Sequence, residues 1–96
     1  MDKITSSPQL VEICKQNNIE YLGLFGSYAR GENTASSDID LLVEFSETKS
    51  LFELSKVERR LEQILGNKVD LVLKNNIKPR IQPYIYQDLR PIYEKR

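Results

Sequence analysis

The sequence contains no histidine and only one cysteine, and these two absences exclude several kinds of chemistry. Without histidine there is no imidazole acid–base catalysis, no histidine-dependent catalytic triad and no histidine-ligated zinc site. The lone Cys14 cannot form a disulfide within the chain, and its helical spacing with Leu10 and Val11 predicts a small core residue. Any catalysis by this chain must therefore do without histidine or a pair of cysteines.

The chain also lacks a long hydrophobic run and an excess of charge of one sign. No stretch approaches the roughly 20 apolar residues that span a bilayer, and the N-terminus lacks the apolar run of a secretory signal, so we expect a cytoplasmic protein. A length of 96 residues suits one compact domain over 1–96. The formal net charge of +0 argues against a wide basic surface for duplex nucleic acid.

The charge is unevenly distributed along the chain. Residues 1–73 carry a net charge of −4 and residues 74–96 carry +4. This basic tail could contact phosphate or an acidic partner, and a simple solvated surface explains it at least as well.

Hydrophobic periodicity predicts an α/β fold in which a mixed β-sheet is flanked by helices. Ser7-Pro8 is a helix-start signal, and Gly66 is a stop signal after a strongly periodic helix. The strand–helix–strand passage from Asp38 to Asp70 is long enough for a crossover, so the second and third strands could be parallel. We predict helices over 8–18, 50–65 and about 79–88, a helical turn over 27–30, strands over 19–25, 38–45 and 68–73, and an edge strand over 91–93. In the last helix, Ile81, Ile85 and Leu89 are predicted to face inward.

Two aspartates alternate with apolar residues in the second strand, which is unusual for a buried element. Asp38 and Asp40 are two residues apart, which places both side chains on one face of a strand, about 7 Å apart at the backbone. Asp70 lies in a similar apolar setting in the third strand. Like charges on a sheet repel and lose hydration, so a bound cation is the natural compensation, and hard oxygen ligands suit Mg²⁺ or Mn²⁺.

A Gly-Ser turn precedes these acids by one loop. Gly26 closes a buried strand, and Gly26-Ser27 could let the backbone approach a phosphate while Ser27 donates its hydroxyl. Arg30 could steady the same phosphate, although a surface arginine is the more ordinary interpretation. Some of the five tyrosines could stack on a base, but most are expected to pack in or near the core.

The spacing of these residues resembles a known family signature. Gly26-Ser27, ten intervening residues and Asp38-Ile39-Asp40 are similar to the signature of the nucleotidyltransferase superfamily that includes DNA polymerase β. The small size resembles its minimal nucleotidyltransferase branch, whose members are commonly antitoxins encoded beside a HEPN-domain ribonuclease toxin. A later strand with a third acid, matching Asp70, extends the resemblance to nearly the whole chain.

The resemblance implies a specific activity and specific residue roles. Asp38 and Asp40 would hold two Mg²⁺ ions, Asp70 would assist one of them, and Gly26-Ser27 would bind the phosphates of ATP. The reaction implied is transfer of AMP from ATP to an acceptor hydroxyl, a tyrosine of the HEPN toxin, which silences the toxin.

Two other functions remain open from the sequence alone. The chain could be an antitoxin that neutralises its toxin by contact, through the basic tail from Lys74 to Arg96. It could also transfer nucleotides to a small molecule or to RNA, although such relatives generally carry a further substrate-binding domain.

Overall fold

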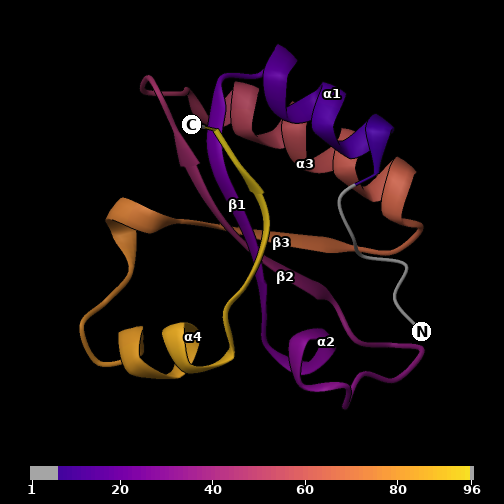
Figure 1. The fold of residues 1–96 in the computed structure, drawn as a ribbon, viewed down its shortest axis with the longest axis vertical. Coiled ribbons are helices and arrows are strands. Elements are labelled where there is room, and N and C mark those ends of the chain that lie inside the picture. Colours follow the sequence, from indigo (N-terminus) through magenta and orange to yellow (C-terminus); the bar gives the residue numbers. More distant parts are fainter. Residues whose placement is uncertain (1–6, 96) are drawn as a thin grey trace.

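A mixed four-stranded sheet forms the centre of the molecule in the computed structural model, which describes residues 7–95 (Figure 1). Its strand order is β3-β2-β1-β4, with β2 and β3 parallel and the other two neighbouring pairs antiparallel. The strands are β1 (Ile19–Phe25), β2 (Ile39–Phe45), β3 (Val69–Leu73) and β4 (Arg90–Glu94). The predicted mixed sheet and the edge position of the last strand are confirmed, and β2 and β3 have the parallel arrangement that the sequence allowed.

Two helices cover one face of this sheet and close the main core. The helices α1 (Pro8–Gln16) and α3 (Leu51–Leu65) lie side by side in Figure 1 and contact each other. They bury Leu10 and Leu61 against the inner residues of the strands, such as Leu41, because alternate strand residues point to the same face. Ser50 begins α3 with a capping box to Glu53, which defines the start of the crossover between the two parallel strands.

The opposite face is only partly covered, by the helix α4 (Gln82–Asp88) and the segment before it, which includes the 3-10 turn η1 (Lys74–Asn76). The turn of helix α2 (Ser27–Arg30) follows β1, and its Tyr28 and Ala29 pack against the main core. A second, smaller cluster packs here around Leu42, Ile77 and Ile85. In Figure 1, α2 and α4 lie together at the end of the sheet away from α1 and α3.

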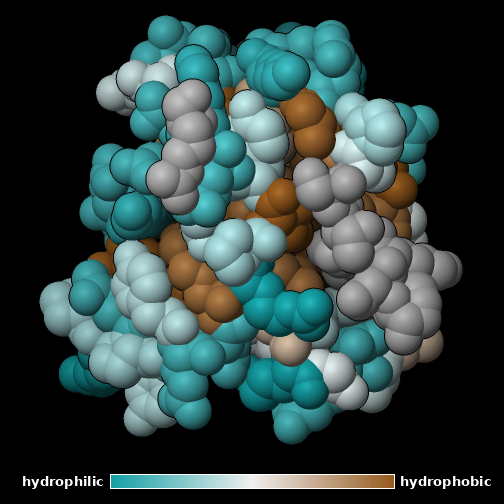
Figure 2. All heavy atoms as spheres, in the orientation of Figure 1, coloured by the Kyte–Doolittle hydropathy of each residue, from teal (hydrophilic) through white to brown (hydrophobic). Residues whose placement is uncertain are grey.

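The surface in the same orientation is mostly hydrophilic, with hydrophobic residues gathered across its middle (Figure 2). Within residues 7–95, we find no helix long and hydrophobic enough to cross a membrane.

Several element boundaries differ from the predictions. Helix α1 ends at Gln16 because the Asn17 side chain caps it by donating to the carbonyl of Ile13, and Asn18 then adopts a positive φ of 60°. Helix α4 begins at Gln82 rather than near 79, because the amide groups of Ile81 and Gln82 both donate to the carbonyl of Lys78 in a preceding turn.

This later start corrects one predicted core residue. Ile81 precedes the first turn of α4 and is 44% exposed, so the prediction that it faces inward was wrong. Ile85 is buried and Leu89 is half-buried beside it, as predicted. Part of the predicted domain over 1–96 lies outside the described residues.

Candidate active site

Asp40 and Asp70 are neighbours across the parallel strands. The register of β2 and β3 pairs Asp40 with Asp70, and paired residues in a parallel ladder direct their side chains to the same face. Asp40 is half-buried and Asp70 is exposed. Both line a cavity of about 360 Å³ on the sheet face that α1 and α3 leave uncovered. The crossover through α3 therefore brings together two carboxylates that are thirty residues apart in the chain.

Gly26 lies against Asp40 at the end of β1. Its backbone has φ 76° and ψ −156°, a conformation essentially restricted to glycine. A Cβ atom at this position would overlap Oδ2 of Asp40. The antiparallel register explains the contact, because Phe25 pairs with Asp40 and Gly26 follows directly. The Gly-Ser turn and the first acid of the cavity are thus in direct contact.

Asp38 lies directly before strand β2, whereas the prediction placed it within that strand. Strand β2 begins at Ile39, so Asp38 is the exposed last residue of the preceding loop and does not line the cavity. Its charge nevertheless acts on Asp40. Within residues 7–95, no three carboxylates are already gathered closely enough to enclose a metal ion. The structure joins Asp40 with Asp70 and leaves Asp38 at the margin of the site.

The electrostatics of Asp40 favour a cation. Burial raises the pKa of Asp40 above its ordinary value, and the charges of Asp70 and Asp38 raise it further, while Arg30 opposes them. Without a cation, the protein therefore holds a carboxylate that its surroundings disfavour. Carboxylate oxygens are the ligands that Mg²⁺ prefers, so the donor set at Asp40 and Asp70 fits this ion.

Arg30 lines the same cavity, but it is engaged by two carboxylates. Its Nε donates to Glu32 at 2.9 Å, and its Nη1 donates to Asp88 of α4 at 2.6 Å. The Asp88 side chain is only 16% exposed. Asp88 was not among the sequence-predicted site residues, and nothing in the local sequence around it indicates a partner 58 positions away.

Helix α4 and the residue before it supply apolar lining that sequence reasoning also missed. Ile81, Tyr84 and Ile85 line the same cavity as the acids, and Tyr84 is 70% exposed. An exposed aromatic side chain beside a charged cavity is suited to stacking against a planar group. The available signal was the helical spacing of these three residues, which by itself predicts packing in the core.

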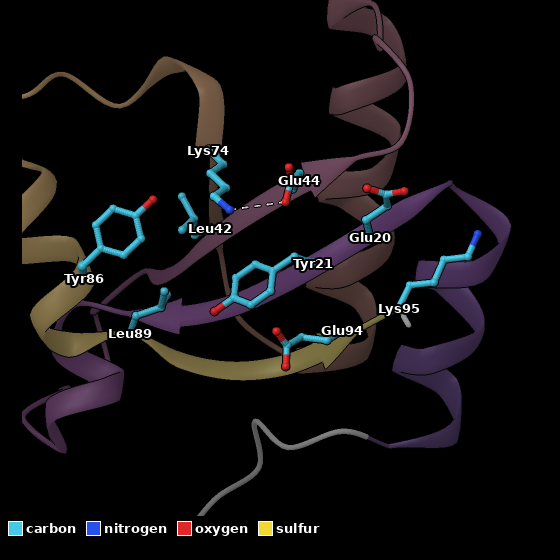
Figure 3. A pocket seen from close by; sticks show the side chains of 9 residues that line it. All are labelled: Glu20, Tyr21, Leu42, Glu44, Lys74, Tyr86, Leu89, Glu94 and Lys95. Carbon is cyan, nitrogen blue, oxygen red and sulfur yellow. Dashed lines mark hydrogen bonds and ion pairs between the residues drawn. The ribbon is translucent and has the colours of Figure 1, made fainter.

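A second cavity, of about 410 Å³, lies farther along the same sheet face (Figure 3). Tyr21 and Tyr86 line it together with charged side chains of both signs, including the Lys74–Glu44 ion pair. The Tyr21 hydroxyl is buried without a hydrogen-bond partner in the described part of the chain. This cavity contains none of the sequence-predicted site residues, so we place the candidate active site at Asp40 and Asp70.

Comparison with known proteins identifies the family of this chain. A family model described as "Polymerase beta, Nucleotidyltransferase" matches residues 8–96. The chain belongs to this family. Protein adenylyltransferase MntA of Thermococcus cleftensis is 38% identical to it over 78 residues, which are 81% of this chain and 79% of that protein. The predicted family is therefore confirmed, and the chain is a nucleotidyltransferase.

Solved structures share the fold of this nucleotidyltransferase. A chain from a crystal structure of a toxin–antitoxin with AMP-PNP superimposes with a TM-score of 0.77 at 21% identity, over 92% of this chain and 73% of that one. A chain from a tri-AMPylated Shewanella oneidensis HEPN toxin in complex with MNT antitoxin gives a TM-score of 0.67 at 19% identity, over 90% of this chain and 67% of that one.

We predict that Gly26→Ala disrupts the nucleotidyltransferase site more than Gly31→Ala does. Both glycines have positive φ, but a Cβ at Gly31 meets nothing within 4 Å, whereas one at Gly26 overlaps Asp40. Urea unfolding should show a loss of about 1–2 kcal/mol for Gly31→Ala and a larger loss for Gly26→Ala. Equal losses would show that the contact with Asp40 imposes no additional constraint.

We also predict that Asp40→Asn stabilises the metal-free protein. Because the folded protein raises the pKa of Asp40, the charged form of this carboxyl destabilises the fold at pH values above that raised pKa. The stability advantage of the variant should therefore grow as the pH rises through this pKa and disappear at more acidic pH. Thermal unfolding of both proteins in EDTA across this pH range measures this difference in stability. An advantage of the variant that grows toward acidic pH would contradict the raised pKa of Asp40.

Proposed function

We propose that this nucleotidyltransferase transfers AMP from ATP to a hydroxyl group, a tyrosine of a cognate HEPN-domain toxin, and thereby acts as an antitoxin. The observation that carries the proposal is the pairing of Asp40 with Asp70 in one cavity beside Gly26. The name of the 38% identical relative, protein adenylyltransferase MntA, supports the choice of reaction. The structural similarity to a chain from a complex containing a HEPN toxin supports the choice of partner.

Each site residue has a role in the proposed reaction. Asp38 and Asp40 would hold two Mg²⁺ ions with help from Asp70, and these ions supply neutralisation of the phosphate charge. Gly26-Ser27 binds the triphosphate, since only a glycine permits the backbone to approach this closely to Asp40. Arg30 lines the cavity. If its guanidinium exchanged its carboxylate partners for a phosphate of ATP, it would help to hold the nucleotide in place.

The bond changes need positioning and charge neutralisation rather than a nucleophile on the enzyme. The acceptor oxygen attacks the α-phosphorus of ATP, the bond from that phosphorus to the bridging oxygen breaks, and pyrophosphate leaves. The carboxylate of Asp70 accepts the proton of the acceptor hydroxyl. Asp70 is exposed at the mouth of the cavity, so an acceptor on another protein can reach it.

The decisive experiment mixes the purified chain with Mg²⁺, ATP and the protein encoded by its neighbouring gene, which we expect to be a HEPN-domain toxin. Intact mass spectrometry should show AMP added to the partner by the wild-type chain and not by Asp38→Ala or Asp40→Ala. Because Asp38 is exposed, Asp38→Ala should unfold at nearly the wild-type temperature. A stable complex without any added AMP would instead show neutralisation by binding alone, and transfer to a free small hydroxyl compound would favour the small-molecule alternative.

We predict that Tyr84 contributes to nucleotide binding by stacking on the base. Tyr84→Ala should raise the KM for ATP about tenfold, because loss of one base–aromatic contact costs about 1–3 kcal/mol, and Tyr84→Phe should restore it. The matched control is Tyr86→Ala on the same helix, since Tyr86 is also exposed but lines the other cavity (Figure 3). If both alanine variants change the KM equally, α4 rather than the ring of Tyr84 is responsible.

A further inference from the structure

Asn67 connects three separate segments of the chain through one side chain. It lies in the turn between α3 and β3, directly after Gly66, and it is half-buried. Its Nδ2 donates to the Tyr28 hydroxyl at 2.7 Å and to the carbonyl oxygen of Ser37 at 3.2 Å. Its Oδ1 accepts from the amide of Lys68 at 2.8 Å. The amide group thus uses both its donors and its acceptor.

Each connected segment leads to one part of the candidate active site. Tyr28 belongs to α2, directly after the Gly26-Ser27 turn. Ser37 directly precedes Asp38. The turn that contains Asn67 leads into β3, whose second residue is Asp70. A single amide outside the cavity therefore connects the segments that carry the phosphate-binding turn and two of the acids.

The backbone on both sides of Asp38 depends on this turn. On one side, the Ser37 carbonyl accepts from Asn67, and on the other the amide of Ile39 donates to the carbonyl of Lys68 at 2.8 Å. The hydrogen bonds between Thr34 and Ser37, by contrast, are made within the loop itself. These hydrogen bonds stabilise the conformation of the loop but do not attach it to the sheet. They therefore do not fix the position of Asp38 relative to the sheet.

We propose that Asn67 is a positioning residue, which holds Asp38 and the Gly26-Ser27 turn in register with Asp70. Asn67 does not line the cavity, so its effect is exerted through these segments. The inference rests on the proposed function, because Asp38 acts as a metal ligand only there. Removing a residue that orients a metal ligand typically lowers metal affinity about 10–100-fold, because the ligand then loses its orientation.

The test compares Asn67→Ala with the matched control Asn17→Ala. Asn17 is also half-buried, and its Nδ2 likewise donates to a backbone carbonyl, at 2.8 Å, but at the end of α1. Amide hydrogen exchange of residues 34–39 and titration with Mn²⁺ alone, followed by electron paramagnetic resonance, measure the effect. Asn67→Ala should speed exchange in this loop and weaken Mn²⁺ binding about tenfold, whereas Asn17→Ala should leave both unchanged.

A second variant keeps the turn intact. Asn67→Asp retains the oxygen that accepts from the Lys68 amide but lacks the donor to Ser37, so exchange of residues 34–39 should rise as it does in Asn67→Ala. Unchanged exchange in both variants, or wild-type Mn²⁺ affinity in folded Asn67→Ala, would overturn the proposal. A wild-type chain that binds no Mn²⁺ and transfers no AMP would refute the proposed function itself, while faster exchange in the variants would still establish the attachment of Asp38.

Discussion

The parallel register that sets Asp40 beside Asp70 is the constraint on which the candidate site depends. A shift of one residue would turn one of these acids toward the face that α1 and α3 cover, where the core contains only apolar residues. The capped crossover helix α3 and the buried strand residues on either side oppose such a shift. The same hydrophobic pattern that folds the sheet therefore places two like charges together. Their repulsion is the physical reason to expect a cation between them.

The two faces of the sheet differ in how completely helices cover them. One face is closed by α1 and α3 and holds most of the buried apolar residues, including Leu41 and Leu61. The other is covered only in part by α4, and so a cavity remains between the acids and the side chains of this helix. The ion pair between Arg30 and Asp88, both of which line that cavity, joins α2 to α4. The candidate site thus lies on the face that contributes less to the core.

Local patterns in the sequence predicted much of this fold, and contacts between distant segments account for what was missed. Alternation within 39–45 and helical periodicity within 51–65 correctly predicted β2 and α3, because each pattern needs only its own residues. The start of α4 depends on a turn at Lys78, which no periodicity reveals, and so Ile81 was misplaced. The second strand begins at Ile39 rather than at the predicted Asp38, a boundary that alternation alone does not define. The contacts of Asp88 and Asn67 depend on partners 58 and up to 39 positions away.

The proposed activity requires that Asp40 and Asp70 share a cation beside a nucleotide whose phosphates rest on the Gly26-Ser27 turn. Anomalous diffraction from crystals grown with Mn²⁺ and a non-hydrolysable ATP analogue tests this requirement most directly. We expect manganese peaks within bonding distance of the Asp40 and Asp70 carboxylates, with the phosphates between the metal and the backbone of Ser27. Manganese and nucleotide bound elsewhere, for example in the cavity around Tyr21, with the two acids left without metal, would contradict the assignment.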